Sequence, residues 1–399
     1  MKKTIALILI LLGIGFHAYL SLHYYELNYG LSTGESVCNL SSTFNCDTVS
    51  ASQFSSLFNM PMALWGLVTN GVLAILLIGW ILGWSDNLNR LGHYVLVLSG
   101  FVALVSVVMG SLSVLFVKTY CLFCIGAYLT SFASFGLIWS EQTDLASLKS
   151  NLLAVFKDAK SYLAYVVAIP VITFLVHSTY VQKVGAQNLG SIVNSSVSDW
   201  QSRAAVDFSA APPSLVSGPD SAPMIITEFA DFTCGHCKNA SPGLKAFANS
   251  RSSSVQLRFY TFPLDSSCNE AIPGGGNGLP CYLAKQTYCA EKTAQKGWAM
   301  HDFIFANQEK INSNRSLEWA KGLIAGFLKD MGIDESSQNV CLESPDTDSV
   351  IRSQAKLASA SGVNGTPTFF VNGKKLSRGQ LLPVLESVYL KITKTGSSQ

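Results

Sequence analysis

The sequence predicts a multi-domain protein in which an all-α transmembrane bundle precedes a soluble α/β domain. Only 13% of the 399 residues are charged and 49% are hydrophobic, whereas soluble proteins carry about 25% charged residues. The long uncharged apolar stretches all end before residue 182, and a sequence of mixed polarity follows them. This composition does not fit an ordinary soluble enzyme.

Five uncharged apolar segments are each about long enough to cross a bilayer. They are residues 4–22, 62–84, 91–117, 121–140 and 161–181. The first segment could instead be a cleaved signal peptide, because two lysines precede it, but its long apolar run and the lack of a small-x-small cleavage site favour a retained span. We therefore expect a transmembrane four-helix bundle plus one extra span.

Positively charged residues mark the cytoplasmic loops of membrane proteins. Lys2 and Lys3 precede the first segment, Arg90 lies between the second and third, and three lysines lie between the fourth and fifth. Residues 23–60, by contrast, contain no Lys or Arg. Five spans then place the residues after about 182 on the extracytoplasmic side, where disulfides form and persist.

All ten cysteines fall on that outer side, or at its edge, in the predicted topology. Cys38 and Cys46 lie in the first external loop, and Cys121 and Cys124 begin the fourth segment. The other six follow the fifth segment: Cys234, Cys237, Cys268, Cys281, Cys289 and Cys341. Short cytoplasmic loops would hold few cysteines in any case, but they do not explain two spaced pairs at one membrane face.

The apolar and soluble parts are separated by residues 183–222, which are rich in Ser, Ala, Gly and Pro. This composition is typical of a flexible linker, and about 40 such residues reach roughly 35 Å. We therefore divide the chain into a membrane domain at 1–140, a cytoplasmic loop and fifth span at 141–182, the linker, and a soluble domain at 223–399.

The soluble part contains a CxxC motif directly after a predicted strand. Met224–Phe229 is a short apolar run of strand type, and Cys-Gly-His-Cys follows before a helical stretch. Cysteines three residues apart in a first helical turn lie about 5 Å apart at Cα, within the range of a disulfide. Because the helix N-terminus stabilises a thiolate, and His236 adds positive charge, we assign Cys234 as the attacking thiol and Cys237 as the resolving thiol.

A strand, a CxxC and a helix in this order resemble the thioredoxin-like fold. A zinc site would need further ligands at close spacing, and no second CxxC follows, so no metal is expected. Residues 365–373, Gly-Thr-Pro-Thr-Phe-Phe-Val-Asn-Gly, supply a second signature. The resemblance implies that Pro367 is cis and lies against the CxxC, where the backbone beside it pairs with a substrate chain.

Residues 264–360 are largely helical in pattern, and this insertion is similar to that of the DsbA-like branch of thioredoxin-like oxidoreductases. Four cysteines lie in it, and four cysteines can pair in three ways. We favour structural bonds between Cys268 and Cys281 and between Cys289 and Cys341, although the sequence alone does not choose between the pairings.

The membrane part has its own CxxC. One helical turn places Cys124 roughly 4–5 Å deeper than Cys121, so Cys121 can face water while Cys124 faces the apolar interior. Such a pair can couple thiol exchange to a lipid-soluble electron carrier. The alternative is that these cysteines are simply small apolar residues in a membrane helix, which would explain one cysteine better than two.

Cys38 and Cys46 lie eight residues apart in a polar loop. This spacing fits a mobile pair that shuttles electrons.

The loop pair, the stretch with Ser52 after it, Pro61 before the second span and the later CxxC resemble the vitamin K epoxide reductase family. Its bacterial members carry a fused thioredoxin-like domain. The resemblance implies a four-helix bundle around a quinone, ubiquinone or menaquinone, with Cys124 against the quinone and Cys121 in exchange with the loop pair. Ser52 would position or polarise the redox site.

These observations together predict a quinone-dependent thiol–disulfide oxidoreductase, multi-pass in the bacterial inner membrane, that makes disulfides in exported proteins. Its partners would be reduced exported proteins, the quinone pool and the lipid bilayer. Near-balanced charge, with 27 Lys and Arg against 25 Asp and Glu and no basic block, predicts no nucleic-acid partner. Three alternatives stay open: a supplier of reducing equivalents to exported thiols, a disulfide-stapled binding module anchored in the membrane, and an enzyme whose useful product is a reduced quinone or epoxide.

Overall fold

The computed structural model describes residues 1–29, 36, 38–39, 44–142, 159–183 and 189–396. The chain splits into two compact units, which are described separately. Unit 1 comprises Met1–Leu27 and Ser36–Asn188, and unit 2 comprises Asn28–Glu35 and Leu189–Gln399.

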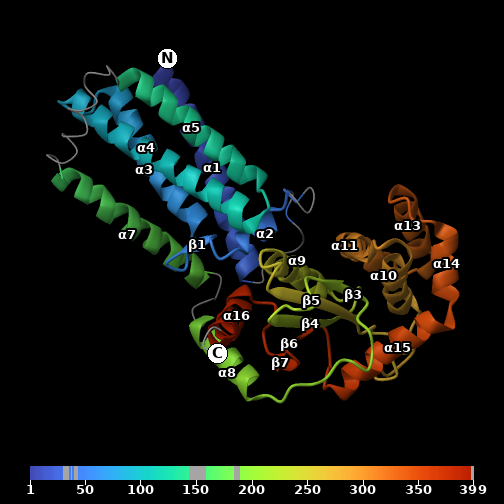
Figure 1. The fold of residues 1–399 in the computed structure, drawn as a ribbon. Helices are drawn as coiled ribbons and strands as arrows, with labels where there is room; N and C mark the ends of the chain where they lie inside the picture. Colours follow the sequence, from blue (N-terminus) through green and yellow to red (C-terminus); the bar gives the residue numbers. More distant parts are fainter. Residues whose placement is uncertain (30–35, 37, 40–43, 143–158, 184–188, 397–399) are drawn as a thin grey trace. The chain divides into compact units, whose positions relative to one another are not determined.

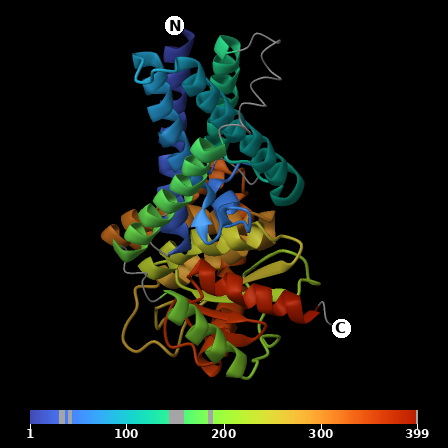
Figure 2. The ribbon, with the colours of Figure 1, turned by 90° about the vertical axis from the view of Figure 1, so that its left-hand side faces the viewer.

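Unit 1 is built from long apolar helices that run side by side (Figures 1 and 2). They are α1 (Lys2–Asn28), α3 (Met62–Leu82), α4 (Leu88–Leu112), which continues into a π-helical turn η1 (Ser113–Val117), and α5 (Leu122–Gln142). Four helices of the described chain are long and apolar enough to cross a membrane: Lys2–Asn28, Met62–Leu82, Leu88–Val117 and Leu122–Glu141. The predicted four-helix membrane bundle is confirmed.

Local sequence signals explain where the second helix of this bundle starts and stops. Pro61 precedes the first residue of α3, and its fixed φ suits that position. Gly83 ends the helix in the left-handed conformation, with φ of 72°, which glycine adopts without steric cost. One stretch of the bundle core is formed by Ala6, Ile10, Leu73, Ala74, Leu77, Trp80, Val95, Leu96 and Ile138.

The fifth apolar segment forms α7 (Ala159–Lys183). It packs on α3, and the Tyr25 hydroxyl lies 2.7 Å from His177 Nδ1. It is not among the four helices that meet the length and hydropathy criteria in the described residues, so the fifth span stays a prediction. The side of the membrane on which unit 2 lies depends on whether this helix crosses the membrane. Most of the predicted cytoplasmic loop, residues 143–158, lies outside the described residues.

The loop between α1 and α3 contains a short helix and a small hairpin. Helix α2 (Cys46–Ser50) is capped by Asn45, whose side chain accepts a hydrogen bond from Thr48 N. Strands β1 (Ser56–Leu57) and β2 (Met60–Pro61) then pair antiparallel. The N-cap fixes the backbone at Cys46, so the loop cysteine enters this helix at a defined position.

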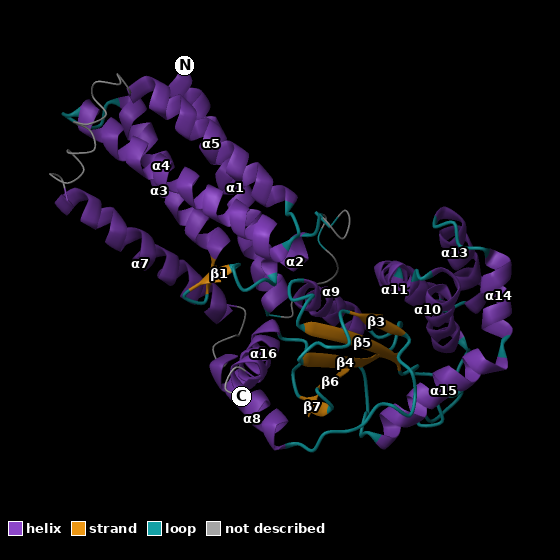
Figure 3. Cartoon of the chain, in the orientation of Figure 1, coloured by secondary structure: helices purple, strands orange, loops and turns teal. Residues whose placement is uncertain are grey.

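Unit 2 is an α/β domain with one five-stranded sheet in the order β3-β5-β4-β6-β7 (Figure 3). The strands are β3 (Leu215–Ser217), β4 (Met224–Ala230), β5 (Val255–Thr261), β6 (Thr368–Val371) and β7 (Lys374–Leu376). Only β4 and β5 pair in parallel, and the other neighbours are antiparallel. This is the predicted thioredoxin-like arrangement, with the CxxC after β4.

Helices flank the sheet and fill the predicted insertion. Helix α9 (Gly235–Asn249) begins within the CxxC, and α16 (Leu382–Gly396) ends the domain. The insertion consists of α10 (Leu279–Ala294), α11 (Gly297–Ala306), α12 (Gln308–Asn314), α13 (Leu317–Asp330), α14 (Glu335–Glu343) and α15 (Pro345–Ala360). The predicted helical insertion is confirmed.

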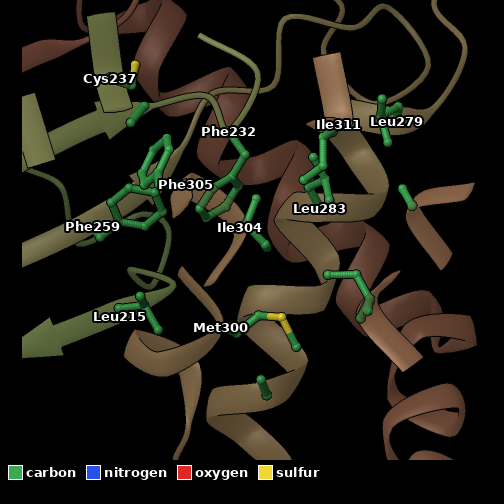
Figure 4. Close-up of a cluster of buried hydrophobic side chains, with 14 of the residues drawn as sticks. Leu215, Phe232, Cys237, Phe259, Leu279, Leu283, Met300, Ile304, Phe305 and Ile311 are labelled. Atoms are coloured by element: carbon green, nitrogen blue, oxygen red, sulfur yellow. The ribbon is translucent and has the colours of Figure 1, made fainter. Parts of the chain in front are cut away.

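A buried aromatic cluster joins the insertion to the sheet (Figure 4). The ring of Phe232 lies 5.5 Å from that of Phe259 on β5 and 5.0 Å from that of Phe305 on α11. Edge and tilted contacts of this kind add to the free energy gained by burying each ring. Because Phe232 precedes Cys234 by two residues, the cluster anchors the start of the CxxC turn.

The stretch predicted as a flexible linker, residues 183–222, contains a helix and a strand. Residues 189–202 form helix α8 (Leu189–Ser202), which packs on α16 and β7. Val197 and Trp200 are buried, and Trp200 Nε1 donates a hydrogen bond to Val371 O at 3.0 Å. The segment is rich in serine, but two large apolar side chains on one face suffice to hold it on the domain. Residues 184–188 lie outside the described residues.

Two disulfides cross-link the helical insertion. They join Cys268 to Cys281 and Cys289 to Cys341, with Cα atoms 6.0 and 5.8 Å apart. These are the two pairs that we favoured from the sequence. The second bond ties α14 to α10, and it closes the longer stretch of chain, 52 residues against 13.

We expect the double change Cys289→Ser and Cys341→Ser to lower the free energy of unfolding of unit 2 by about 4 kcal/mol, because the unfolded chain then regains the entropy of a long loop. The matched change at Cys268 and Cys281 should cost about 3 kcal/mol, since its loop is shorter. Urea titration of the full chain with proteolysis of the unfolded fraction measures both. Equal stability of the Cys289/Cys341 variant and the parent would contradict the structural role.

Candidate active site

The CxxC of unit 2 lies where β4 gives way to α9. Cys234 is the N-cap of α9 and is partly exposed, whereas Cys237 is 0% exposed. The Cys234 sulfur lies 3.4 Å from Thr366 O, and the Thr366–Pro367 peptide bond is cis. The two sequence signatures of this domain therefore meet in space, and only Cys234 presents its sulfur to solvent.

The environment of Cys234 favours its thiolate. Hydrogen bonding from the Cys237 thiol is the largest cause that lowers the pKa of Cys234, to about 5, and Thr366 and the backbone N–H groups of Cys237 and His236 add to it. Burial, followed by the hydrogen bond to Cys234, raises the pKa of Cys237 well above its usual range. The sequence suggested the helix N-terminus and His236 as causes, but it did not indicate Thr366.

Replacing Thr366 with valine should raise the pKa of Cys234 by about one unit, because a hydrogen bond to a charged group is lost while the shape is kept. The Thr366 hydroxyl is buried and has no hydrogen-bond partner among the described residues, so it is available to the thiolate. The rate of iodoacetamide modification at Cys234, read by mass spectrometry across pH, measures the shift. In the parent the rate should rise through a pH of about 5.

The control for this change is Thr368→Val, two residues away. The Thr368 hydroxyl donates to Gly365 O at 2.7 Å, so its removal should leave the inflection where it is in the parent. Equal shifts in both variants, or no shift in either, would contradict a specific hydrogen bond from Thr366.

Glu228 is a functional candidate that the sequence reasoning missed. It lies on β4, is 2% exposed, and its Oε1 has no hydrogen-bond partner among the described residues. Burial, followed by the nearby charge of Cys234, raises the pKa of Glu228 to about 8, while Lys245 opposes the shift. A glutamate inside the apolar run MIITEF was the available signal, because strand interiors rarely bury a lone carboxyl.

The change Glu228→Gln should stabilise unit 2 at pH 9 and have little effect at pH 4. The unfolded carboxyl ionises near 4.5 and the folded one near 8, so the parent loses stability as the pH rises between these values, by up to about 5 kcal/mol. Unfolding free energies at the two pH values measure this. An equal effect of the substitution at pH 4 and pH 9 would show that ionisation is not the cause.

Helix α12 holds the backbone of the CxxC turn. Gln308 Nε2 donates to Phe232 O at 2.8 Å and to Cys234 O at 2.9 Å, and Asn312 Nδ2 donates to Thr233 O at 2.9 Å. These carbonyls lie beyond the end of β4, and Cys234 O also accepts hydrogen bonds from the backbone N–H groups of Cys237 and Lys238. Side-chain amides from the insertion therefore satisfy them and fix the turn that presents Cys234.

Three cysteines meet in unit 1. Cys38 and Cys46 form a disulfide with Cα atoms 5.8 Å apart, and Cys46 Sγ lies 3.3 Å from Cys121 Sγ. Cys121 and Cys124 are unbonded, and Cys124 N donates to Cys121 Sγ at 3.1 Å. Sulfurs at this separation can exchange a disulfide without a large movement of the backbone.

The loop that carries Cys46 is held by polar contacts. Asn39 Oδ1 accepts a hydrogen bond from Cys46 N at 2.8 Å, and Asn45 N donates to Tyr120 O at 2.9 Å. The hydroxyl of Ser52, the other predicted site residue, donates to Val49 O at 2.8 Å and so closes the turn after α2. A part for Ser52 in polarising the redox site stays a prediction.

A cavity of about 630 Å³ lies beside this cysteine cluster in unit 1. Residues of α1, α3, α4, α5 and α7 line it, and most of these residues are apolar. Cys124 reaches it, as do His17, Gly66 and Tyr128. Its volume is typical of sites for small organic molecules. The sequence placed Cys124 in the apolar interior, but it could not name the residues around it.

Four apolar helices with one CxxC, joined to an α/β domain with another, define a membrane thiol–disulfide oxidoreductase. Residues 4–139 match the model of the vitamin K epoxide reductase family, and residues 210–382 match a thioredoxin family model. The chain thus consists of a vitamin K epoxide reductase family domain fused to a thioredoxin-like domain.

The solved structures to which this chain is similar include α-DsbA1 from Wolbachia pipientis and BdbD from Bacillus subtilis. Both are 20% identical with a TM-score of 0.37; the first covers 45% of this chain and 92% of its own, the second 48% and 97%. Likeness at this level carries no conclusion about function.

Curated relatives include Na⁺/H⁺ antiporters from Salinispora tropica, 30% identical over 162 residues, and Salinispora arenicola, 27% identical over 164. Each match covers 40% of this chain but only 22% of the relative. Because the chain spans about a fifth of the length of these relatives, their antiport activity is not transferred to it.

Proposed function

We propose that this protein forms disulfide bonds in exported proteins and passes the electrons through its three cysteine pairs to a membrane quinone. The observation that supports this most directly is the 3.3 Å separation of Cys46 Sγ and Cys121 Sγ, next to a cavity that Cys124 lines. A loop disulfide, a second thiol pair and an apolar cavity then follow one another in space. The proposed location is the bacterial inner membrane, with unit 2 on the extracytoplasmic side.

The proposed path begins with a reduced substrate, whose two thiols reduce the Cys234–Cys237 disulfide. The unit 2 pair next reduces the Cys38–Cys46 disulfide, and Cys46 then attacks Cys121 of an oxidised Cys121–Cys124 pair. Each exchange passes through one mixed disulfide, so one S–S bond breaks for each that forms. Two electrons and two protons are passed on at each stage.

The apolar cavity suits a quinone as the final acceptor. Its walls are largely hydrocarbon, and the Cys124 sulfur reaches it, as the reduction of a lipid-soluble ring requires. A bound quinone accepts two electrons and two protons and leaves as a quinol. The chain's part is to hold the ring against Cys124 and to keep bulk water away.

The low pKa of Cys234 favours oxidation of substrates over their reduction. At neutral pH a group with a pKa of about 5 is a thiolate, which stabilises the reduced pair and makes its disulfide a stronger oxidant. A supplier of reducing equivalents would need the reverse. Glu228 lies close enough to Cys237 that its negative charge, when it is ionised, raises the pKa of the Cys237 thiol.

The test uses the full chain in lipid with a reduced unfolded protein and a soluble quinone. We expect quinol and substrate disulfides to form in equal amounts, and the Cys234–Cys237 pair to become reduced when quinone is withheld. A pair that stays oxidised without quinone would contradict the oxidase. A binding module would produce neither quinol nor disulfides.

The location has a separate test. A membrane-impermeant maleimide added to intact, cell-wall-stripped cells should modify Cys234 of the reduced protein. Modification that requires lysis of the cells would place unit 2 in the cytoplasm and would remove exported proteins as substrates.

A further inference from the structure

The cavity beside Cys124 contains a histidine that neither the sequence motifs nor the family match assigns. We propose that His17 is the proton-transferring residue of quinol formation, acting through Nε2 on an oxygen of the quinone. This inference rests on the proposed function, since it concerns the same cavity. It adds a catalytic residue to a site that otherwise has only a source of electrons.

The hydrogen bond of His17 fixes which nitrogen can transfer a proton. Nδ1 lies 2.7 Å from Gly13 O, one turn earlier on α1. A carbonyl oxygen only accepts hydrogen bonds, so Nδ1 carries the hydrogen of the neutral ring. Nε2 is therefore the nitrogen that gains and loses a proton.

Helix α3 passes so close to the imidazole that only glycine fits at the contact. A Cβ at Gly66 would lie 2.2 Å from His17 Nε2 and 2.0 Å from His17 Cδ2. Gly66 and His17 both line the cavity. The missing side chain at Gly66 thus leaves room for the imidazole between α1 and α3, beside the cavity that both residues line.

The other groups that face the cavity are less suited to proton transfer near neutral pH. The titratable ones are Tyr24, Tyr94, Cys124 and Tyr128, and no Asp, Glu, Lys or Arg is among the described residues that line it. Phenols ordinarily release a proton near pH 10, and Cys124 is the electron donor.

Two hydroxyl groups of the cavity lining are already used in hydrogen bonds. The Thr69 and Ser106 hydroxyls donate to carbonyls of their own helices, Trp65 O and Val102 O. Histidine is the side chain that changes charge between about pH 5 and 8.

The proposed step balances. Two thiols and a quinone become a disulfide and a quinol: the S–S bond between Cys121 and Cys124 forms, two S–H bonds break, and two O–H bonds form. The electron pair passes from the sulfurs to the ring while His17 Nε2–H gives its proton to a ring oxygen. His17 then takes the proton that the Cys124 thiol releases. The Cys121 thiol releases its proton to solvent, and solvent supplies the second proton of the quinol.

The first test compares His17→Gln with His93→Gln in the full chain in lipid, with a soluble quinone as electron acceptor. His93 lies on α4 and is not among the cavity-lining residues. For H17Q we expect kcat for quinol formation to fall about 100-fold or more and the KM for quinone to change less than about 3-fold. The parent's kcat should fall as pH rises, because Nε2 must carry a proton in order to donate it, and this fall should disappear in H17Q. H93Q should match the parent.

The second test moves the imidazole without removing it. Gly66→Ala places a methyl group where the ring lies, whereas Gly71→Ala, on the same helix, meets nothing within 4 Å. We expect G66A to reproduce the loss of kcat and G71A to keep the activity of the parent. Alkylation of Cys121 and Cys124 at the parental rate shows that each variant is folded.

The outcomes separate the inference from the proposed function. A parent protein that forms no quinol overturns both. A parent that forms quinol, with H17Q keeping its kcat and pH profile, overturns the role of His17 alone. A rise in KM at constant kcat also overturns it, because His17 would then bind the ring without transferring a proton.

Discussion

Replacing Cys124 with alanine should lower quinol formation by about 1,000-fold or more, because the residue that passes electrons to the acceptor is removed. Of the two cysteines in this CxxC, Cys124 lines the cavity. Cys121 lies against the loop pair, with its Sγ 3.3 Å from Cys46 Sγ. Exchange among the outer cysteines should continue. Quinol formation and thiol exchange, measured separately on the same preparation, show whether the first is lost while the second is kept.

The same geometry predicts which intermediate accumulates. Without Cys124, a disulfide between Cys46 and Cys121 has no neighbour in the CxxC to resolve it, and the further change Cys38→Ala removes the other resolving thiol. After treatment with a small-molecule disulfide, which takes up the two electrons that the thiols lose, peptide mapping of the doubly changed protein should recover the Cys46–Cys121 link. Quinol formation by Cys124→Ala at more than a tenth of the parental rate would contradict the assigned order of the relay.

The sequence predicts most of what depends on local pattern. Uncharged apolar segments long enough to span a bilayer predict the helices of the bundle, and the short apolar run before the CxxC predicts strand β4. The helix within the predicted linker was missed because the composition of that stretch is that of a linker, while its stability comes from the burial of Trp200 against β6, a contact 171 residues away in the chain. Such contacts depend on tertiary packing and leave no local signal.

The active-site chemistry shows the same division. The spacing identifies Cys234 and Cys237, because two residues three apart in a helical turn lie within the Cα distance range of a disulfide. Glu228 and His17 are each a single polar residue in an apolar run, and their importance depends on what the fold brings to them. For Glu228 this is the thiolate of Cys234, and for His17 it is the bare backbone at Gly66.

Replacing Cys237 with alanine should stop turnover and trap substrates on the protein as mixed disulfides through Cys234. Cys237 is 0% exposed, whereas Cys234 is partly exposed and has a pKa of about 5, so the first reaction with a substrate belongs to Cys234 and the resolving step to Cys237. Cys234 of this variant is first converted to a mixed disulfide with glutathione, and a thiol of the reduced substrate then displaces the glutathione. Acid quenching and non-reducing electrophoresis should reveal the substrate adduct.

The reverse variant, Cys234→Ala, is the matched control, and it should give little adduct because its remaining thiol is buried and has a raised pKa. The pH dependence gives a second readout. The Cys237 thiol is the largest cause of the low pKa of Cys234, so Cys237→Ala should move the inflection for alkylation of Cys234 to higher pH. Adducts at equal yield from both variants would show that either cysteine can attack, and the distinction between an attacking and a resolving thiol would have to be abandoned.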